Sequence, residues 1–184
     1  MQTKKIIATV AAGLLMSVCV QAQTEPEFVG SVFLLMPDST TIQLERQNAV
    51  GGETTNAASY VPYVGLFAGK TKTMSKVEGV ASPVRVSAGT AITLIMRVGD
   101  NTLDPTLQLS VFKLEQKKTF RFVETAQYTL TSTTQGKIQY FPFTAKKFGQ
   151  SSYIVTLTGL GAGEYAVIQA GSVGMFHLFG VNSL

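Results

Sequence analysis

The sequence is poor in side chains that carry reactive chemistry. Its 184 residues include one cysteine, Cys19, and one histidine, His177. Ser-His-Asp catalysis needs a histidine that moves a proton, and zinc sites need clustered histidines or cysteines. His177 lies inside the apolar stretch Met175–Val181, where a histidine is typical of a core or edge position. We therefore expect no catalytic residue, no metal site and no cofactor, and we expect that the protein is not an enzyme.

Nucleotide and calcium motifs are also incomplete. Gly69-Lys70-Thr71 resembles the end of a phosphate-binding loop, but Val64 stands where that motif needs glycine, and no helix is expected to follow. Asp100, Asn101 and Asp104 lack the spacing of a calcium loop and fit ordinary turns. One enzymatic alternative stays open, a hydrolase with paired carboxylates, because such partners can come from distant strands.

Charged residues make up only 14% of the chain, and the formal net charge is +4. Lys4 and Lys5 carry two of these charges, so the rest of the chain has a net charge of +2. This small excess does not favour nucleic acid as a partner.

The N-terminus has the order of parts found in a secretory signal peptide. Lys4 and Lys5 precede the uncharged, mostly apolar stretch Ile6–Val20, and Val20 and Ala22 fit a cleavage site after Ala22. We expect residues 1–22 to be a cleaved signal peptide and residues 23–184 to be one domain without a transmembrane segment. A membrane anchor is the alternative, although the apolar stretch is shorter than the roughly 20 residues that span a bilayer.

Cleavage after Ala22 would leave no cysteine in the mature chain. Lipid attachment at Cys19 is disfavoured, because Val18 stands where a lipoprotein signal needs a small residue. We expect an exported bacterial protein located in the periplasm, at the cell surface or outside the cell.

Short apolar runs rich in Val, Ile, Phe, Tyr and Thr alternate with turn residues, which is typical of β-strands. The predicted strands are Phe28–Met36, Thr40–Arg46, Tyr60–Phe67, Thr71–Glu78, Val84–Ser87, Ala91–Val98, Leu107–Leu114, Thr119–Tyr128, Lys137–Thr144, Ser152–Thr158, Glu164–Ala170 and Met175–Val181. Pro37-Asp38-Ser39 is predicted to be the first turn, and Gln47–Ser59 a long surface loop. The pattern predicts an all-β fold, an antiparallel β-sandwich with Greek-key topology.

Two predicted strands are apolar on both faces. Val32–Met36 and Ile92–Met96 lack the alternation of a half-buried strand. A covering loop would explain this pattern, and so would an interface with another subunit.

Leu160, Gly163 and Tyr165 match the Leu-x-x-Gly-x-Tyr pattern of a tyrosine corner. In that motif the tyrosine hydroxyl binds upstream backbone where the chain crosses between sheets. The alternative is an ordinary hairpin with a buried tyrosine. In either case, we expect Tyr165 to have a structural role.

The C-terminal third resembles a known kind of module. Gly163-Glu164-Tyr165-Ala166, Phe176 and Phe179-Gly180-Val181 are similar to the ending of β-sandwich modules in exported bacterial proteins of unassigned function. The resemblance covers about 40 residues and implies an immunoglobulin-like sandwich. It implies no activity, because fold alone does not carry one.

Two groups of residues are candidates for binding. Lys113, Lys117, Lys118 and Arg121 flank a predicted hairpin and would meet an anionic partner if they converge with Lys146 and Lys147. Tyr60 and Tyr63 would stack on a sugar or anchor a protein if they are exposed. The alternatives are a solvated charged edge for the first group and core packing for the second.

These observations favour an exported, non-enzymatic binding or accessory module that recognises a protein or a glycan. A structural subunit of an oligomeric envelope assembly is the alternative, because two strands are apolar on both faces. The hydrolase with distant carboxylates is the third hypothesis.

Overall fold

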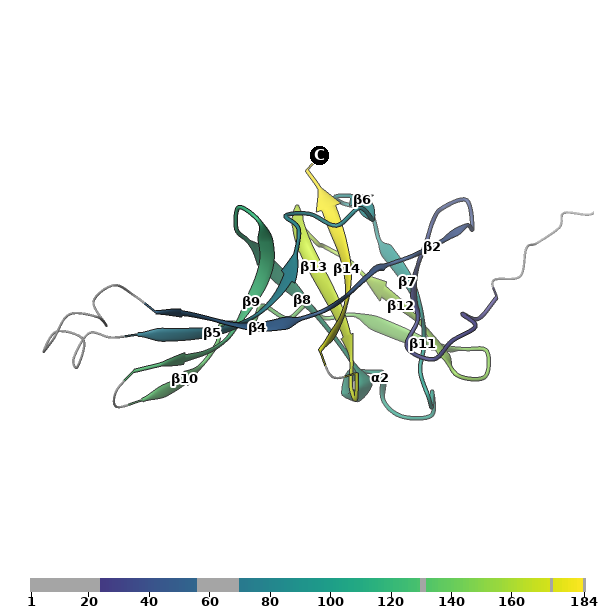
Figure 1. The fold of residues 1–184 in the computed structure, drawn as a ribbon. Coiled ribbons are helices and arrows are strands. Elements are labelled where there is room, and N and C mark those ends of the chain that lie inside the picture. The colour runs from purple at the N-terminus through teal and green to yellow at the C-terminus, as the bar shows by residue number, and fades with distance from the viewer. Residues whose placement is uncertain (1–23, 56–69, 130–131, 173, 184) are drawn as a thin grey trace, which may run out of the picture.

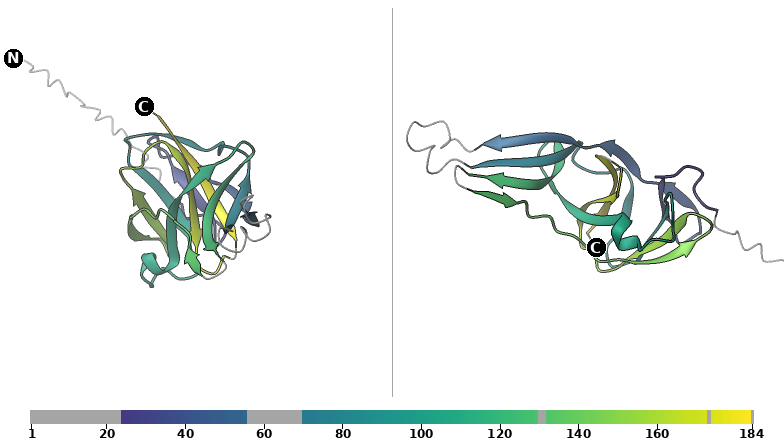
Figure 2. Two further views of the ribbon diagram at one scale, coloured as in Figure 1. Left: turned by 90° about the vertical axis from the view of Figure 1, so that its left-hand side faces the viewer. Right: turned by 90° about the horizontal axis from the view of Figure 1, so that it is seen from below.

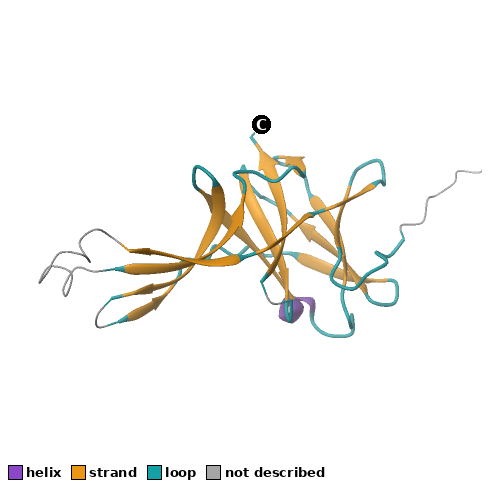
Figure 3. Cartoon of the chain, viewed as in Figure 1, coloured by secondary structure: helices purple, strands orange, loops and turns teal. Residues whose placement is uncertain are grey.

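The computed structural model describes residues 24–55, 70–129, 132–172 and 174–183. These residues form an all-β sandwich in which two sheets pack face to face (Figures 1 and 3). The predicted strand Tyr60–Phe67, Tyr60, Tyr63, Cys19 and the predicted signal peptide lie outside the described residues.

The first sheet has five strands in the order β11-β12-β7-β1-β2, and every pair in it is antiparallel. Its strands are β1 (Val32–Leu35), β2 (Thr41–Gln43), β7 (Ile92–Arg97), β11 (Thr144–Phe148) and β12 (Ser152–Leu157).

The second sheet follows the order β3-β14-β13-β8-β9-β5-β4, with β10 paired to β9 and β6 paired in parallel to β14. Its strands are β3 (Glu45–Asn48), β4 (Val50–Thr55), β5 (Thr71–Glu78), β6 (Arg85–Ser87), β8 (Leu109–Gln116), β9 (Phe120–Tyr128), β10 (Thr133–Gln135), β13 (Gly163–Gln169) and β14 (Met175–Asn182). The single-turn helix α2 (Pro105–Gln108) precedes β8.

The second sheet curls until its two ends meet. β3 pairs with β14 at one end of the sheet, β4 pairs with β5 at the other, and only Ala49 separates β3 from β4. The stretch 45–55 therefore closes β14, β13, β8, β9 and β5 into a ring of strands. Beyond the ring, β4, β5, β10 and the end of β9 project as an arm (Figures 1 and 2).

The main core lies between the two sheets. Alternation places one face of each strand against the other sheet. The buried residues of this core are Val32, Leu34, Leu44, Ile92, Leu94, Met96, Val98, Leu109, Val111, Tyr153, Val155, Leu157, Leu160, Tyr165, Val167, Phe179 and Val181.

The opposite face of the second sheet encloses a smaller core inside the ring. Its buried residues are Val77, Phe112, Leu114, Val123, Ala166, Phe176 and Leu178. β13 and β14 supply both cores, because their successive side chains point to opposite faces. The near-continuous apolar sequence of β14 follows from this double burial.

A buried ion network closes one end of the ring. The fully buried Arg121 on β9 donates to the Glu45 carboxylate at 3.0 Å and to the Glu164 carboxylate at 3.3 Å. Arg121 also donates to the carbonyl oxygens of Glu78 at 3.0 Å and Gly79 at 3.1 Å. All three guanidinium nitrogens are therefore bound to the protein, as the low-dielectric interior requires of a charged group.

Glu164 is shared between two arginines. The Glu164 Oε1 atom accepts from Arg85. The Oε2 atom, which accepts from Arg121, also accepts from the Ser82 backbone N–H at 2.8 Å. Gly180 makes room for this pair, because a Cβ there would lie 1.7 Å from the Arg85 Nη1 atom. Only glycine permits such an approach at this point of β14.

The apolar strands β1 and β7 are partly covered by the N-terminal described segment. Arg97 on β7 donates to the carbonyl oxygens of Pro26 and Glu27, both at 2.7 Å, which holds this segment over the outer face. Ile95 on that face is only 1% exposed, whereas Phe33 and Leu35 stay half-buried. Coverage by this segment thus explains why Ile95 is buried although it lies on the outer face of the sheet.

Most predicted strands are confirmed, and β5 has the predicted bounds. The loop predicted over Gln47–Ser59 is wrong over 47–55, because β3 ends at Asn48 and β4 occupies 50–55; residues 56–59 lie outside the described residues. The glycines and polar residues of β4 do not show the apolar alternation that indicates a strand. Backbone pairing with β5 stabilises β4 instead. The strand predicted over Lys137–Thr144 is also wrong. Only two of its residues form backbone bonds to β8, through the Gln139 carbonyl and the Phe141 N–H, and Pro142 has no N–H to continue the ladder.

Tyr165 follows the crossover from β12 in the first sheet to β13 in the second. Its buried ring stacks on Phe179, and its hydroxyl donates to the Gly161 carbonyl oxygen at 2.7 Å. The hydrogen bond is the one expected upstream of the strand. The assignment of Leu160, Gly163 and Tyr165 to the tyrosine-corner motif stays a prediction, as do the Greek-key and immunoglobulin-like descriptions.

Replacing Arg121 by methionine tests the ion network. We expect Arg121→Met to lower the free energy of unfolding by about 3–5 kcal/mol, because it leaves the buried Glu164 and the partly buried Glu45 without their shared partner. Urea unfolding followed by far-UV circular dichroism measures this change. Lys118→Met is the matched control at an exposed position and should change the value by less than about 0.5 kcal/mol. Equal effects of the two substitutions would contradict the structural role of Arg121.

Candidate functional site

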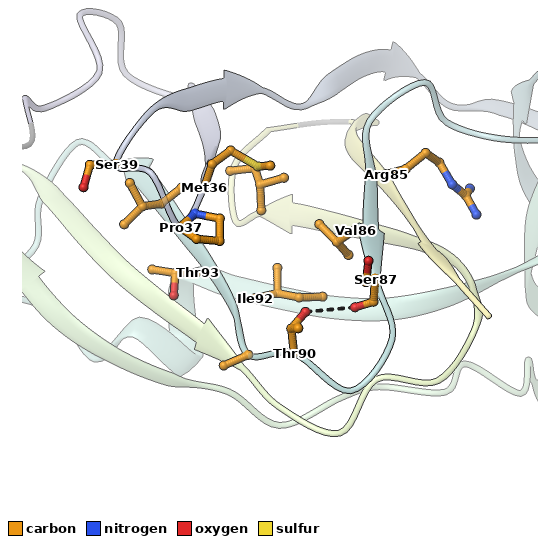
Figure 4. A pocket seen from close by; sticks show the side chains of 12 residues that line it. Met36, Pro37, Ser39, Arg85, Val86, Ser87, Thr90, Ile92 and Thr93 are labelled. Carbon is orange, nitrogen blue, oxygen red and sulfur yellow. Dashed lines mark hydrogen bonds between the residues drawn. The ribbon is translucent and has the colours of Figure 1, made fainter. Parts of the chain in front are cut away.

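A cleft of about 490 Å³ opens at the edge of the sandwich, between β6 of one sheet and β1 and β7 of the other (Figure 4). Its volume falls in the range of small-molecule and side-chain pockets. Its lining residues are Leu34, Leu35, Met36, Pro37, Ser39, Arg85, Val86, Ser87, Thr90, Ala91, Ile92 and Thr93.

Two turns shape the mouth of this cleft. The β1–β2 turn is closed by Asp38, whose carboxylate accepts from the Thr40 hydroxyl at 2.6 Å and from its backbone N–H at 3.0 Å. These two hydrogen bonds lower the pKa of Asp38. In the β6–β7 turn, the Thr90 hydroxyl donates to the Ser87 carbonyl oxygen at 2.9 Å. Local hydrogen bonds therefore fix the conformation of both turns at the mouth of the cleft.

Apolar side chains predominate in the interior of the cleft. The side chains of Met36, Val86 and Ile92 lie around the cavity, with the Pro37 ring beside them (Figure 4). The Arg85 side chain points away from the cavity, toward Glu164 and the Asn182 side chain. This lining contains hydroxyl groups but no carboxylate, imidazole or thiol, so it is suited to hold an uncharged apolar group.

β6 presents an open edge beside the cleft. It pairs in parallel with β14 on one side, where the Gly180 N–H donates to the Val84 carbonyl oxygen at 2.9 Å. Within the described residues, no strand pairs with its other edge. Apart from the Ser87 carbonyl oxygen, which accepts from Thr90, this edge is open. An open strand edge beside an apolar cavity is the combination that recognises an extended peptide.

Sequence reasoning did not find this cleft. Met36 and Ile92 carry an ordinary strand signal, and Pro37 and Ser39 an ordinary turn signal. The cleft arises where three segments distant in sequence meet at the sandwich edge. No local spacing encodes that meeting.

The basic group predicted around the β8–β9 hairpin is only partly on the surface. The prediction that Arg121 belongs to a basic binding surface is wrong, because its side chain points into the ring and forms ion pairs with Glu45 and Glu164. Lys113 donates to the Ala162 carbonyl oxygen at 3.2 Å and lies 5.9 Å from the Tyr165 ring centre. Lys117 lies over the Phe122 ring at 5.7 Å, and Lys118 is exposed.

Lys146 and Lys147 are both exposed on β11, the edge strand of the five-stranded sheet. The β8–β9 turn belongs to the other sheet. Register places Lys146 opposite Ile154 and Lys147 opposite Tyr153, so the two lysines point to opposite faces of β11. They therefore do not form one common surface with each other.

Asp100, Asn101 and Asp104 serve local structure. The two aspartates accept from Thr102 and Thr106, respectively, and these bonds lower the pKa of each. The buried Asn101 amide donates to the Ser152 carbonyl oxygen at 3.1 Å. In the described ranges, no three histidine, cysteine, aspartate or glutamate residues gather where a metal ion would fit.

Comparison with known proteins gives no relative: no family model, no curated protein and no solved structure matches the chain. None of the helical residues that the structure describes forms a segment long and apolar enough to cross a bilayer.

His177 gives the sandwich a testable pH dependence. It is 1% exposed on β14, and its Nδ1 atom has no hydrogen-bond partner among the residues that the structure describes. Burial, with a smaller effect of the Arg46 charge, lowers its pKa from 6.5 to about 4. On acidification His177 therefore takes up a proton in the unfolded chain before it does so in the folded one. The contribution of neutral His177 to the free energy of unfolding is complete above about pH 6.5 and is lost as the pH falls toward 4.

We expect this contribution to fall by about 2 kcal/mol between pH 7 and pH 5. Urea unfolding of the natural protein and of His177→Leu at several pH values isolates it. The variant should show a flatter pH profile in this window, whatever its absolute stability. Parallel profiles for the two proteins would show that His177 is already accessible to protons in the fold.

Proposed function

We propose that the protein is an exported, non-enzymatic binding module that recognises an extended segment of a partner protein at the sandwich edge. The observation that carries this proposal is the apolar cleft beside the open edge of β6. A partner strand laid along β6 gains backbone hydrogen bonds, and its side chain enters the space around Met36, Val86 and Ile92.

The character of the lining favours binding over chemistry. General acid–base catalysis needs a titratable group within hydrogen-bond reach of the substrate. Arg85 is the one charged residue of this lining, and Glu164 and Asn182 hold its guanidinium outside the cavity. Apolar contacts in the cleft would contribute to affinity, and hydrogen bonds to the β6 backbone would set the orientation of the bound segment.

Export is the other part of the proposal. It is supported by the leader-like order of Lys4, Lys5, the apolar stretch Ile6–Val20 and Ala22. The absence of cysteine after residue 22 means that the fold needs no oxidising partner for disulfide formation.

A structural role in an oligomer is the second candidate. Phe33, Leu35 and Ile154 are half-buried on the outer face of the five-stranded sheet. The register places Phe33 and Ile154 on either side of Ile95, which the N-terminal segment covers. The half-buried apolar residues beside Ile95 favour contact with another subunit.

Filling the cleft tests the first candidate. Ala91 lines the exposed mouth, so Ala91→Trp should block entry of a partner side chain and weaken binding about 10- to 100-fold. The partner is first captured from the native envelope with the purified protein, and its affinity is then measured by surface plasmon resonance.

Thr134→Trp is the matched control, because Thr134 is exposed on β10 in the projecting arm and lies outside the cleft. It should bind with the affinity of the natural protein. Undiminished binding by Ala91→Trp would exclude the cleft as the recognition site, and a partner that is captured only as a second copy of the chain would favour the structural role.

A further inference from the structure

A second cleft lies where the ring of strands closes. It has a volume of about 780 Å³, and β3, β4, β5 and the start of β9 contribute to it. Its lining residues are Gln47, Asn48, Val50, Lys76, Val77, Glu78, Gly79, Thr119 and Phe120. None of these residues lines the cleft beside β6, so this site is independent of the proposed function.

Hydrogen bonds from Gln47 and from the interior of the ring fix the backbone that forms one wall of this cleft. The Gln47 side-chain amide joins β3 to β5, accepting from the Glu78 N–H at 2.8 Å and donating to the Glu78 carbonyl oxygen at 3.2 Å. The buried Arg121 holds the Glu78 and Gly79 carbonyl oxygens from inside the ring. The cleft is therefore formed before any ligand arrives, which lowers the entropy cost of binding.

Polar side chains stand free around the cleft. Asn48, Glu78 and Thr119 are exposed, and within the described part of the chain their side chains have no hydrogen-bond or ion-pair partner. Lys76 is two residues from Glu78 on the same face of β5. The Lys76 ammonium lies over the Phe120 ring, 5.9 Å from its centre, and forms no ion pair with a described residue.

Apolar surface lies between these polar groups. Register places Val50 opposite Lys76 and Phe120 opposite Glu78, so all four residues share one face. Val50 is 59% exposed, and Phe120 is partly exposed. A ligand in the cleft thus meets apolar carbon on one side and amide, carboxylate, ammonium and hydroxyl groups around it.

We propose that this cleft binds a neutral saccharide. A sugar ring has C–H groups on its faces and hydroxyls around its edge, and each hydroxyl both donates and accepts. Glu78 accepts, Lys76 donates, and the Asn48 amide does both. Lys76 and Glu78 carry opposite charges, so the cleft gives no net preference for an anion or a cation, and the set fits an uncharged polyhydroxylated ligand.

Titration with defined sugars tests the proposal. The full chain, labelled with nitrogen-15, is titrated with neutral oligosaccharides of glucose, mannose, galactose and N-acetylglucosamine. Oligomers of galacturonic acid and of glucosamine are the acidic and basic arms. We expect at least one neutral sugar to bind and to shift the backbone amide signals of Asn48, Val50, Glu78 and Gly79.

Two substitutions at exposed positions locate the site without disturbing the core. Asn48→Ala and Glu78→Gln should each weaken binding of the neutral sugar about 10-fold. Their matched controls, Gln139→Ala and Glu115→Gln, are also exposed and lie outside the cleft, so they should leave the affinity unchanged. Far-UV circular dichroism verifies that all four variants are folded.

Three outcomes overturn the proposal: no neutral sugar binds at roughly 10 mM, only charged sugars bind, or the shifts fall outside the cleft and survive Asn48→Ala. The Ala91→Trp variant separates the two sites. Its sugar affinity should equal that of the natural protein even where its protein partner is lost.

Discussion

The fold depends on one guanidinium group that is removed from water. Arg121 is fully buried, and its charge is balanced by Glu45 on β3 and Glu164 on β13, the two strands that flank β14. Desolvation of such a group costs several kcal/mol, so the interaction is stable only where the geometry satisfies every donor. This requirement fixes which strands must meet: β9 has to lie where β3 and β13 present their carboxylates. A shift of β9 would move Arg121 away from both carboxylates and leave buried charge without a partner.

The same group connects the interior of the ring with its surface. Arg121 holds the backbone carbonyl oxygens of Glu78 and Gly79, and these residues form one wall of the cleft at the ring closure. Glu164 in turn holds Arg85, whose guanidinium is thereby kept out of the other cleft. The network thus leaves one cleft apolar and supports the walls of the other. Two clefts of different chemical character are thus connected by a single set of ion pairs.

Much of the sandwich could be predicted from its sequence, because alternation is a local signal. Tyr153, Val155 and Leu157 of β12 face the main core as their spacing predicts. The ring could not be predicted. β4 lacks apolar alternation and depends on the ladder to β5, so its residues resemble a loop. The position of Arg121 could not be predicted either. It lies four residues after Lys117 and near Lys118, and only the register of β9 turns it inward. The clefts were missed because each combines segments that are distant in sequence.

The double role of β13 and β14 explains why the chain supports two cores with few charged residues. Tyr165 and Phe179 face the main core, while Ala166 and Leu178 face the interior of the ring. Strands buried on both faces present no side chains to solvent, so the described clefts lie at the margins of the fold. The clefts lie at such margins, at the sandwich edge and at the closure of the ring. A change that moves either strand would therefore disturb both sites together, whereas a change at one margin should leave the other site intact.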